Sequence, residues 1–294
     1  MSHVAFIGLG AMGGPMARNL IAGGHDVAVH DAAEAAVAGF ADVNCRRASS
    51  AAEATTDAEF VITMLPTAAN VRAALLENGG ACETLPAGAL VIDMSTVGAG
   101  DSTALAADLG ERGYRMIDAP VGRGPLQAEA GTLLIMAGGD SADIDAARPL
   151  FDCMADKVVH VGPQGHGIKL KLVNNYMSMV GVAMTAETLA LASKAGLDRE
   201  TVVDVLQGTA AGRGAINDRF PRKVLSGDVS PEFPVRLGGK DLKLALGLGV
   251  EEASPLALGA AADHWFDRAH DEGRANEDCT ALLLVLEAMD AETG

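Results

Sequence analysis

A lysine and two asparagines lie in one stretch of the chain at spacings that place them on one side of a helix. Within residues 165–175, Lys171 stands three residues before Asn174 and four before Asn175, whereas Lys169 would point elsewhere. Residues three and four apart are neighbours on a helix surface. An ammonium beside an amide can hold a carbonyl oxygen and a neighbouring acidic group together, which predicts a catalytic segment. The alternative is a solvated helix start with ordinary lysines.

An arginine between two glycines forms a second candidate site. Arg123, flanked by Gly122 and Gly124, comes just after a predicted strand at residues 115–121. Ligands of open α/β sheets bind at the carboxyl ends of the strands. The glycines let backbone approach a ligand, and the planar guanidinium suits bidentate recognition of a carboxylate, phosphate or sulfonate. A solvated arginine in a surface loop is the alternative.

Three glycines near the start of the chain have the spacing of a dinucleotide-binding loop. Gly8, Gly10 and Gly13 follow an apolar run at residues 4–7 in the pattern G-x-G-x-x-G. The first glycine permits a tight turn, the second lets the backbone approach a pyrophosphate, and the third lets a helix pack close to the strand. The N–H groups at the start of that helix face the phosphates. Because a strand precedes the glycines and another follows, a nucleotide site is favoured over a plain glycine-rich turn.

An aspartate after the second predicted strand indicates which nucleotide is bound. Residues 26–30 form this strand, and Asp31 follows it directly. A carboxylate about 20 residues past the glycines binds the ribose hydroxyls of NAD. Ala32 and Ala33 add no cation, so we expect the 2′-phosphate of NADP to be repelled. Arg46 and Arg47 are the cations that could reach the same site and weaken this prediction.

Four residues at the ends of two further strands are expected to line the same crevice, because carboxyl ends of parallel strands meet at one edge of a sheet. Ordinary strand ends are the alternative. These residues are Leu65 and Pro66 after the strand 59–64, and Ser95 and Thr96 at the end of the strand 90–94.

A lysine late in the chain is a candidate for the nicotinamide end of the cofactor. Lys240 stands next to Asp241 in a helical pattern, so a charge pair on a wet helix is the alternative. The seven histidines have no partner at catalytic or metal spacing, and we expect surface or packing roles for them. No metal site is predicted.

The pattern of the chain changes near residue 163. Up to about residue 160, short β-branched runs alternate with helical ones, which predicts an α/β doubly wound, mainly parallel sheet of the Rossmann type over residues 1–163. From residue 168 onward nothing resembles a strand, so residues 164–294 are predicted to form an all-α domain entered by a long interdomain helix. The remaining strands of the sheet are predicted at residues 132–137 and 158–161.

Composition narrows the function classes. The net charge of −17 disfavours a nucleic-acid or anionic-membrane surface, although a small anionic substrate needs only a few cations in one pocket. The apolar stretch at residues 176–195 contains Glu187 and Lys194 and is expected to be a buried helix, not a membrane span. The first strand begins too early for a targeting segment and the four cysteines are scattered, so we expect a cytoplasmic protein.

These segments together resemble the β-hydroxyacid dehydrogenase family, which includes 3-hydroxyisobutyrate dehydrogenase and tartronate semialdehyde reductase. The likeness covers nearly the whole chain, with four motifs in the same order and spacing. They are the cofactor motif at residues 8–20 with Gly24-His25, the substrate motif at residues 118–121 with 131–133, the catalytic motif Gly165-x-Gly167-x-x-x-Lys171-x-x-Asn174-Asn175, and Lys240-Asp241-Leu242.

One departure from the family pattern concerns the acidic group of the substrate. Common members have Ser-Gly-Gly after Asp-Ala-Pro-Val, whereas this chain has Gly122-Arg123-Gly124. This looks like the 3-sulfolactaldehyde reductase branch, which residues 174–178, 208–212 and 223–228 also resemble. Residues 124–127, Gly-Pro-Leu-Gln, depart from that branch.

By the resemblance, the protein is an NAD-dependent oxidoreductase that reduces 3-sulfolactaldehyde to 2,3-dihydroxypropane-1-sulfonate, reversibly. Lys171 is then the catalytic acid and base. The resemblance implies substrate contacts from Gly122, Arg123, Gly124, Asn174, Asn175, Tyr176, Met177 and Ser178, and cofactor contacts from Ala11, Met12, Asp31, Leu65, Thr96 and Lys240.

Other readings stay open at this point. Within the enzyme class, the substrate is another short acidic semialdehyde, such as succinic, tartronic or methylmalonic semialdehyde. In other classes, the chain is a nucleotide-sensing regulator or an imine reductase, and the presence of Lys171 argues against both. The long apolar helix predicts a homodimer or homotetramer.

Overall fold

The computed structural model describes residues 1–217 and 219–289, which divide into two compact units, residues 1–177 and residues from 178 onward. The division falls inside helix α8 (His166–Lys194). The domain boundary after residue 163 lies just before this helix and stays a prediction.

The first unit is built on one sheet in which parallel pairing dominates. The strand order is β3-β2-β1-β4-β5-β6-β8-β7, with β9 paired to β8. The first six strands in this order, from β3 through β2, β1, β4 and β5 to β6, pair in parallel. Strand β8 runs antiparallel to β6 and β7, and β9 is parallel to β8. The strands are β1 (His3–Ile7), β2 (Asp26–His30), β3 (Arg46–Arg47), β4 (Phe60–Thr63), β5 (Leu90–Asp93), β6 (Arg115–Asp118), β7 (Val121–Gly122), β8 (Leu133–Gly138) and β9 (Ala155–Gly162).

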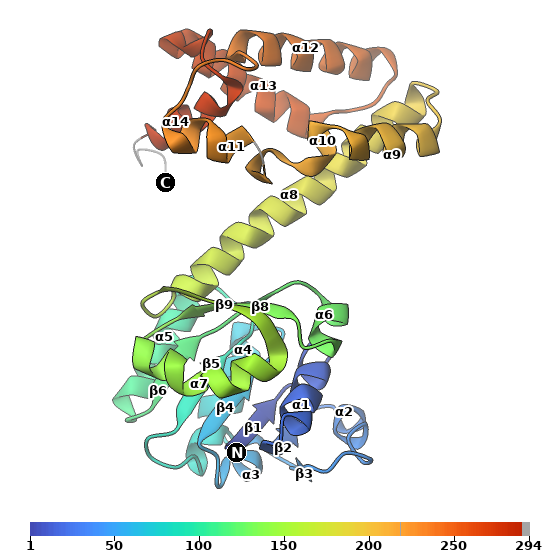
Figure 1. The fold of residues 1–294 in the computed structure, drawn as a ribbon. Helices are drawn as coiled ribbons and strands as arrows, with labels where there is room; N and C mark the ends of the chain where they lie inside the picture. Colours follow the sequence, from blue (N-terminus) through green and yellow to red (C-terminus); the bar gives the residue numbers. More distant parts are fainter. Residues whose placement is uncertain (218, 290–294) are drawn as a thin grey trace. The chain divides into compact units, whose positions relative to one another are not determined.

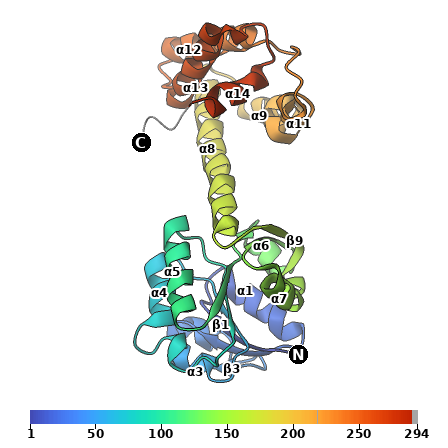
Figure 2. The same ribbon diagram turned by 90° about the vertical axis from the view of Figure 1, so that its left-hand side faces the viewer.

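Helices cover both faces of this sheet, as the doubly wound fold requires (Figures 1 and 2). The helices of the first unit are α1 (Gly13–Ala22), α2 (Glu34–Ala38), α3 (Ala51–Thr55), α4 (Ala68–Leu76), α5 (Ala99–Glu111), α6 (Pro125–Glu129), α7 (Ser141–Met154) and the 3₁₀ turn η1 (Ala81–Glu83).

Side chains of one strand supply two separate cores. Along β1, Val4 and Phe6 pack with residues of α1 and α7, whereas Ala5 and Ile7 pack with residues of α3, α4 and α5. Successive side chains of a strand point to opposite faces. All four are buried, which explains why this strand reads as a continuous apolar run.

The predicted strand at residues 115–121 is two strands in the structure. β6 ends at Asp118, and β7 begins at Val121 and pairs with β8 alone. Proline has no N–H to donate to a sheet, so Pro120 interrupts the pairing. The break directs the chain after Asp118 across the carboxyl edge of the sheet. Strand β3 lies outside the predicted ranges.

The second unit is helical, as predicted. Capping explains one helix start, because the Asp198 side chain accepts a hydrogen bond from the N–H of Thr201 at 2.9 Å. No helix among residues 1–217 and 219–289 is long and apolar enough to cross a membrane. After α8 come α9 (Arg199–Gly208), α10 (Ala210–Arg213), η2 (Ala215–Asn217), α11 (Arg219–Arg222), η3 (Val224–Ser226), α12 (Val235–Glu251), α13 (Ala257–Ala269), η4 (His270–Arg274), η5 (Cys279–Ala281) and α14 (Leu282–Glu287).

Candidate active site

A cleft of about 840 Å³ opens at the carboxyl ends of β1, β2 and β4. Its volume lies within the usual range for small-molecule and cofactor sites. Eight of the residues predicted to bind the cofactor line this cleft. They were predicted from the glycine spacing, from the strand ends and from the family resemblance. They are Gly8, Gly10, Ala11, Met12, Gly13, Asp31, Leu65 and Pro66.

The three glycines of the loop meet different surroundings. Gly8 has a φ of +102°, and a Cβ there would lie 2.3 Å from the carbonyl oxygen of Met64. A Cβ on Gly13 would lie 2.0 Å from the carbonyl oxygen of Gly8, so α1 can start this close to β1 because residue 13 is glycine. A Cβ on Gly10 would meet nothing within 4 Å, so its backbone faces open space. That combination fits a dinucleotide whose pyrophosphate lies over Gly10 and the start of α1.

Both carboxylate oxygens of Asp31 are held by backbone N–H groups at the cleft. Oδ2 accepts from Leu9 at 2.7 Å, and Oδ1 accepts from Ala33 at 2.8 Å. A carboxylate has lone pairs for further bonds, so ribose hydroxyls can still be accepted. Asp31 thus fixes the glycine loop as well as lining the cleft.

The two arginines that could have favoured NADP do not line this cleft. The guanidinium of Arg46 donates to the carbonyl oxygens of Glu53 and Ala54, at 2.6 and 3.0 Å. These carbonyls lie in the last part of α3, where a cation is favoured. The guanidinium of Arg46 is therefore bound to α3 and does not face the cleft, and Arg47 is exposed on β3.

Ser95 lies behind the cleft wall. It is 2% exposed, and its Oγ accepts a hydrogen bond from the N–H of Leu65 at 2.9 Å. The buried carboxylate of Asp93 accepts in turn from Ser95 N–H at 3.1 Å and from the Thr63 hydroxyl at 2.8 Å. Ser95 thus supports a cleft residue and is absent from the lining itself, as is the exposed Thr96.

Lys171 is on the first part of α8, half-buried, and Asn175 shares its face. Ile168, three residues before Lys171, is 1% exposed, so this face of the helix packs on the first unit. Burial lowers the pKa of the Lys171 ammonium below its ordinary value. A lysine with a lowered pKa can both give and take a proton, as an acid and base must. Asn174 is exposed and donates to the Asn175 side-chain oxygen at 3.3 Å.

Arg123 adopts a backbone conformation that only glycine adopts freely. Its φ is +74°, between β7 and the start of α6. One guanidinium nitrogen lies 2.7 Å from both carboxylate oxygens of Asp156 and also donates to the Thr132 carbonyl oxygen. This ion pair could not be predicted from local sequence patterns, because Asp156 is 33 residues away along the chain. The pair is partly exposed on both sides.

The glycines beside Arg123 have separate structural roles. Gly122 is buried and pairs with Leu134 of β8. Gly124 precedes Pro125, the first residue of α6, and its N–H donates to the Gln127 side chain at 3.2 Å. Both hold the loop that presents Arg123.

The remaining predicted contacts belong to two helices. Tyr176 and Met177 are exposed residues of α8 within the first unit, and Ser178 is the exposed first residue of the second unit. Lys240 is on α12 of the second unit, with its ammonium 2.8 Å from Asp241 Oδ1. Their roles toward substrate and cofactor stay predictions.

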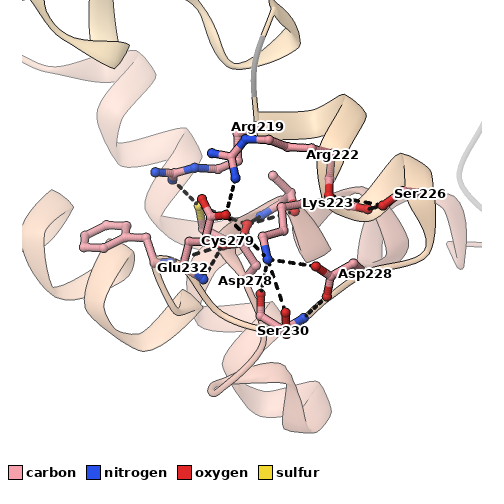
Figure 3. A network of polar contacts seen from close by, with 11 residues as sticks. Arg219, Arg222, Lys223, Ser226, Asp228, Ser230, Glu232, Asp278 and Cys279 are labelled. Carbon is pink, nitrogen blue, oxygen red and sulfur yellow. Dashed lines mark hydrogen bonds and ion pairs between the residues drawn. The ribbon is translucent and has the colours of Figure 1, made fainter.

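The segment 223–228 serves the architecture of the second unit. The side chain of Lys223 is 8% exposed, and its ammonium bonds Asp228 at 2.8 Å and both oxygens of Ser230 (Figure 3). The fully buried Asp278 accepts bonds from the backbone of Glu232 and Phe233 close by. A buried lysine satisfied in this way ties the chain after α11 to the loop before α12. The contact with Asp228 raises the pKa of Lys223.

Sequence reasoning missed several polar residues of the cleft. Ser49 and Ser50 follow β3, and Asn70 lies in the first turn of α4 after β4. Thr67 accepts from Asn70 N–H at 3.2 Å as the cap of α4, so the spacing Thr67-x-x-Asn70 after a strand was the available signal. His30, Ala32, Asn78 and Gly79 also line the cleft.

The doubly wound sheet, the glycine loop and the carboxylate after the second strand define a dinucleotide-binding protein, and its relatives make it an NAD-dependent oxidoreductase. Comparisons with known proteins agree. Residues 3–162 match the NAD-binding domain of 6-phosphogluconate dehydrogenase, and residues 165–286 match the NAD-binding domain of NADP-dependent 3-hydroxyisobutyrate dehydrogenase. The chain belongs to the 3-hydroxyisobutyrate dehydrogenase-like family of β-hydroxyacid dehydrogenases, as the resemblance implied, and NAD is its cofactor.

Individual relatives differ in the substrate their names give. The 3-sulfolactaldehyde reductase of Escherichia coli K12 is 42% identical over 96% of this chain and 95% of its own. The NAD-dependent L-serine dehydrogenase of Pseudomonas aeruginosa is 35% identical over 98% of both. A solved structure of the Mycobacterium tuberculosis 3-hydroxyisobutyrate dehydrogenase with L-serine is 33% identical, with a TM-score of 0.67, and covers 98% of this chain and 100% of that one.

Proposed function

We propose that the protein reduces 3-sulfolactaldehyde to 2,3-dihydroxypropane-1-sulfonate with NADH, reversibly and in the cytoplasm. The family gives the reaction class, a hydride exchange between a nicotinamide and an alcohol carbon. The 42% identity to a 3-sulfolactaldehyde reductase supports the sulfonate over other acidic groups.

The observation that carries the sulfonate is the strained arginine. At a φ of +74°, glycine has no steric penalty, whereas a side chain there costs roughly 1–3 kcal/mol. Such strain persists where neighbouring groups hold the residue, and it clusters at functional sites, which supports a role for this side chain. A guanidinium next to two glycines can approach three sulfonate oxygens with several N–H groups, whereas a serine hydroxyl offers one donor.

The acid and base of the reaction is Lys171 in this proposal. When bound, NADH supplies the hydride that adds to the carbonyl carbon. The Lys171 ammonium donates a proton to the carbonyl oxygen, so that the aldehyde becomes the alcohol. In the reverse direction the neutral amine removes the hydroxyl proton. Asn174, Asn175 and Ser178 would hold the substrate with Arg123, beside Gly122, Gly124, Tyr176 and Met177.

The cofactor would be held by the glycine loop, with Asp31 at the adenosine ribose. Leu65 and Pro66 close the other side of the cleft, supported by Ser95. Thr96 and Lys240 complete the proposed cofactor contacts. The excluded 2′-phosphate makes NADH the preferred donor.

A carboxylate semialdehyde is the second candidate substrate. The guanidinium of Arg123 is already bound by Asp156, which would leave the asparagines of α8 to hold the acidic group. Relatives named for L-serine and 3-hydroxyisobutyrate are 35–36% identical to this chain. A substrate panel separates the two: sulfolactaldehyde, its alcohol and the common semialdehydes, each with both cofactors. Turnover confined to carboxylates would reject the sulfonate.

We also propose a homodimer or homotetramer. Val173, Tyr176, Met177 and Met179 are large apolar side chains of α8 that are more than half exposed in the single chain. Contiguous exposed apolar surface favours association. Light scattering of the purified protein tests this, and a monomer at micromolar concentration would contradict it.

A further inference from the structure

The carboxylate of Asp118 bonds the first turn of the helix that carries Lys171. Asp118 is the last residue of β6 and is 1% exposed. Its Oδ1 accepts from the N–H of Gly165 at 2.6 Å, and its Oδ2 accepts from the N–H of Ile168 at 2.7 Å. The first N–H groups of a helix have no partner inside the helix, and a negative charge is favoured at that end. One side chain therefore joins the end of β6 to the start of α8.

Two glycines allow this helix start to lie directly on the sheet. A Cβ on Gly167 would come within 2.3 Å of the Met136 carbonyl oxygen and 2.6 Å of the Asp118 carbonyl oxygen. A Cβ on Gly138 of β8 would come within 2.6 Å of the Gly167 nitrogen and 2.7 Å of Asp118 Oδ1. These are contacts to backbone or to a fixed carboxylate, so neither glycine can be replaced without moving the helix. The start of α8 is thereby held close against the end of β6 and against β8.

We propose that Asp118 is a positioning residue for Lys171: through its two bonds to the first turn of α8, it sets the place and the burial of the ammonium one turn further on. This inference rests on the proposed acid–base role of Lys171. Ile168, which Asp118 bonds, and Lys171 are three residues apart and share a helix face. A shift or rotation of the first turn is thus passed directly to the lysine.

The rate of proton transfer depends on where the Lys171 ammonium lies relative to the substrate. A misplacement of about 1 Å at a distance from the chemistry can lower a rate by about 10²-fold. Because burial lowers the pKa of Lys171, a displaced and more exposed lysine would also titrate at a higher pH. An unfolded chain would expose Lys171 fully and raise the midpoint as well, so the midpoint is read only from variants that bind NADH as the wild type does. In such folded variants, a raised midpoint reports a displaced lysine and not a loss of stability.

A matched control lies on the neighbouring strand. Asp93 of β5 is opposite Asp118 in the parallel register and is 2% exposed. Its carboxylate accepts hydrogen bonds from the Thr63 hydroxyl and the Ser95 N–H. Asp93→Asn leaves both bonds between Asp118 and the start of α8 in place, so it tests whether a change in the neighbouring buried charge alone moves the midpoint.

The experiment compares Asp118→Asn, Asp118→Ala, Gly167→Ala and Asp93→Asn with the wild type. The rate at which an amine reagent labels Lys171 is followed against pH by peptide mass spectrometry of the full-length protein without cofactor. Exposed Lys169 in the same peptide region serves as the internal reference. Turnover and the dissociation constant for NADH are measured on the same samples.

We expect Asp118→Ala to raise the labelling midpoint of Lys171 and to lower kcat on the order of 10- to 10²-fold, with NADH binding unchanged. Asp118→Asn keeps one acceptor oxygen and should give a smaller shift in the same direction. Gly167→Ala should reproduce the effect, because a Cβ there would push the same first turn of α8 away from Asp118 and Met136. Asp93→Asn should leave the Lys171 midpoint at its wild-type value.

Wild-type midpoints in the Asp118 and Gly167 variants would overturn the positioning role, as would an equal shift in Asp93→Asn. If the Asp118 variants fail to fold, the midpoint of the Gly167 variant alone tests whether the first turn of α8 positions Lys171. A Lys171→Ala enzyme with normal turnover would instead reject the acid–base role of Lys171 on which this inference rests, whatever the midpoints show. The two failures are therefore distinguishable.

Discussion

Asp156 holds the guanidinium of Arg123 with both of its carboxylate oxygens, each 2.7 Å from the same nitrogen. The arginine proposed to bind the substrate's acidic group thus has an anionic partner within the protein. Exchange of one anion for another costs less than stripping a buried charge, since both groups are partly exposed. We infer that the carboxylate and the sulfonate compete for Arg123.

Removing the Asp156 carboxylate, which competes for Arg123, should therefore strengthen the binding of the sulfonate substrate. Exposed ion pairs contribute about 0.2–1 kcal/mol, so Asp156→Asn is expected to lower the KM for the sulfonate by up to about fivefold. Raised salt should reduce the difference between wild type and variant. Steady-state kinetics at two ionic strengths measure both. An increased KM in Asp156→Asn would show that the ion pair orients Arg123 for binding.

Arg123→Gly should separate function from stability. Loss of a charged hydrogen-bond donor costs about 1.5–3 kcal/mol, so kcat/KM for the sulfonate should fall about 10- to 10²-fold. The Tm should be maintained or raised, because glycine accepts a φ of +74° without strain. Unchanged sulfonate kinetics would remove Arg123 from the substrate site. Gly122→Ser with Arg123→Gly should shift preference toward carboxylate semialdehydes.

Replacement of Asp31 should change both the preference for NAD over NADP and the affinity for NADH. Wild-type enzyme should favour NAD over NADP, and Asp31→Ala should relax that preference. Because Asp31 also bonds Leu9 in the glycine loop, the variant should bind NADH more weakly as well. Fluorescence titration with NADH and NADPH gives both quantities. Equal efficiency of the wild type with the two cofactors would refute the assignment.

The pH dependence should differ between the two directions of the reaction. Reduction needs the Lys171 ammonium and should decline as pH rises through its pKa, whereas alcohol oxidation needs the amine and should rise. Burial lowers that pKa, so both midpoints should lie below the ordinary lysine value of about 10.4. Rates across pH in each direction test this. Identical profiles would exclude a shared titrating group.

Replacing the same lysine should affect chemistry more than cofactor binding. General acid–base groups contribute about 10²- to 10⁴-fold in rate, so Lys171→Ala should lose turnover on that scale. NADH affinity should change little, because the lysine acts on the reacting oxygen. A variant that keeps more than about a tenth of wild-type turnover would fall outside that range and remove Lys171 from the role.

Local patterns predicted the fold and the cofactor cleft well. The G-x-G-x-x-G loop and Asp31 depend on spacing along a strand, a turn and a helix, which sequence displays directly. The break at Pro120 was readable from its missing N–H, yet the surrounding apolar run concealed it. Two functional contacts were beyond sequence reasoning, Arg123 with Asp156 and Asp118 with the start of α8. Both join residues more than 30 positions apart, and only the packing of the sheet brings them together.

The most direct test of the central claim is a competition between two aldehydes. Wild-type enzyme with NADH is given equal concentrations of 3-sulfolactaldehyde and methylmalonate semialdehyde, and the two alcohols are quantified at early times. Their ratio equals the ratio of the two kcat/KM values. The proposed function predicts an excess of 2,3-dihydroxypropane-1-sulfonate of about tenfold or more, the equivalent of one charged hydrogen bond at Arg123. An excess of 3-hydroxyisobutyrate would contradict it.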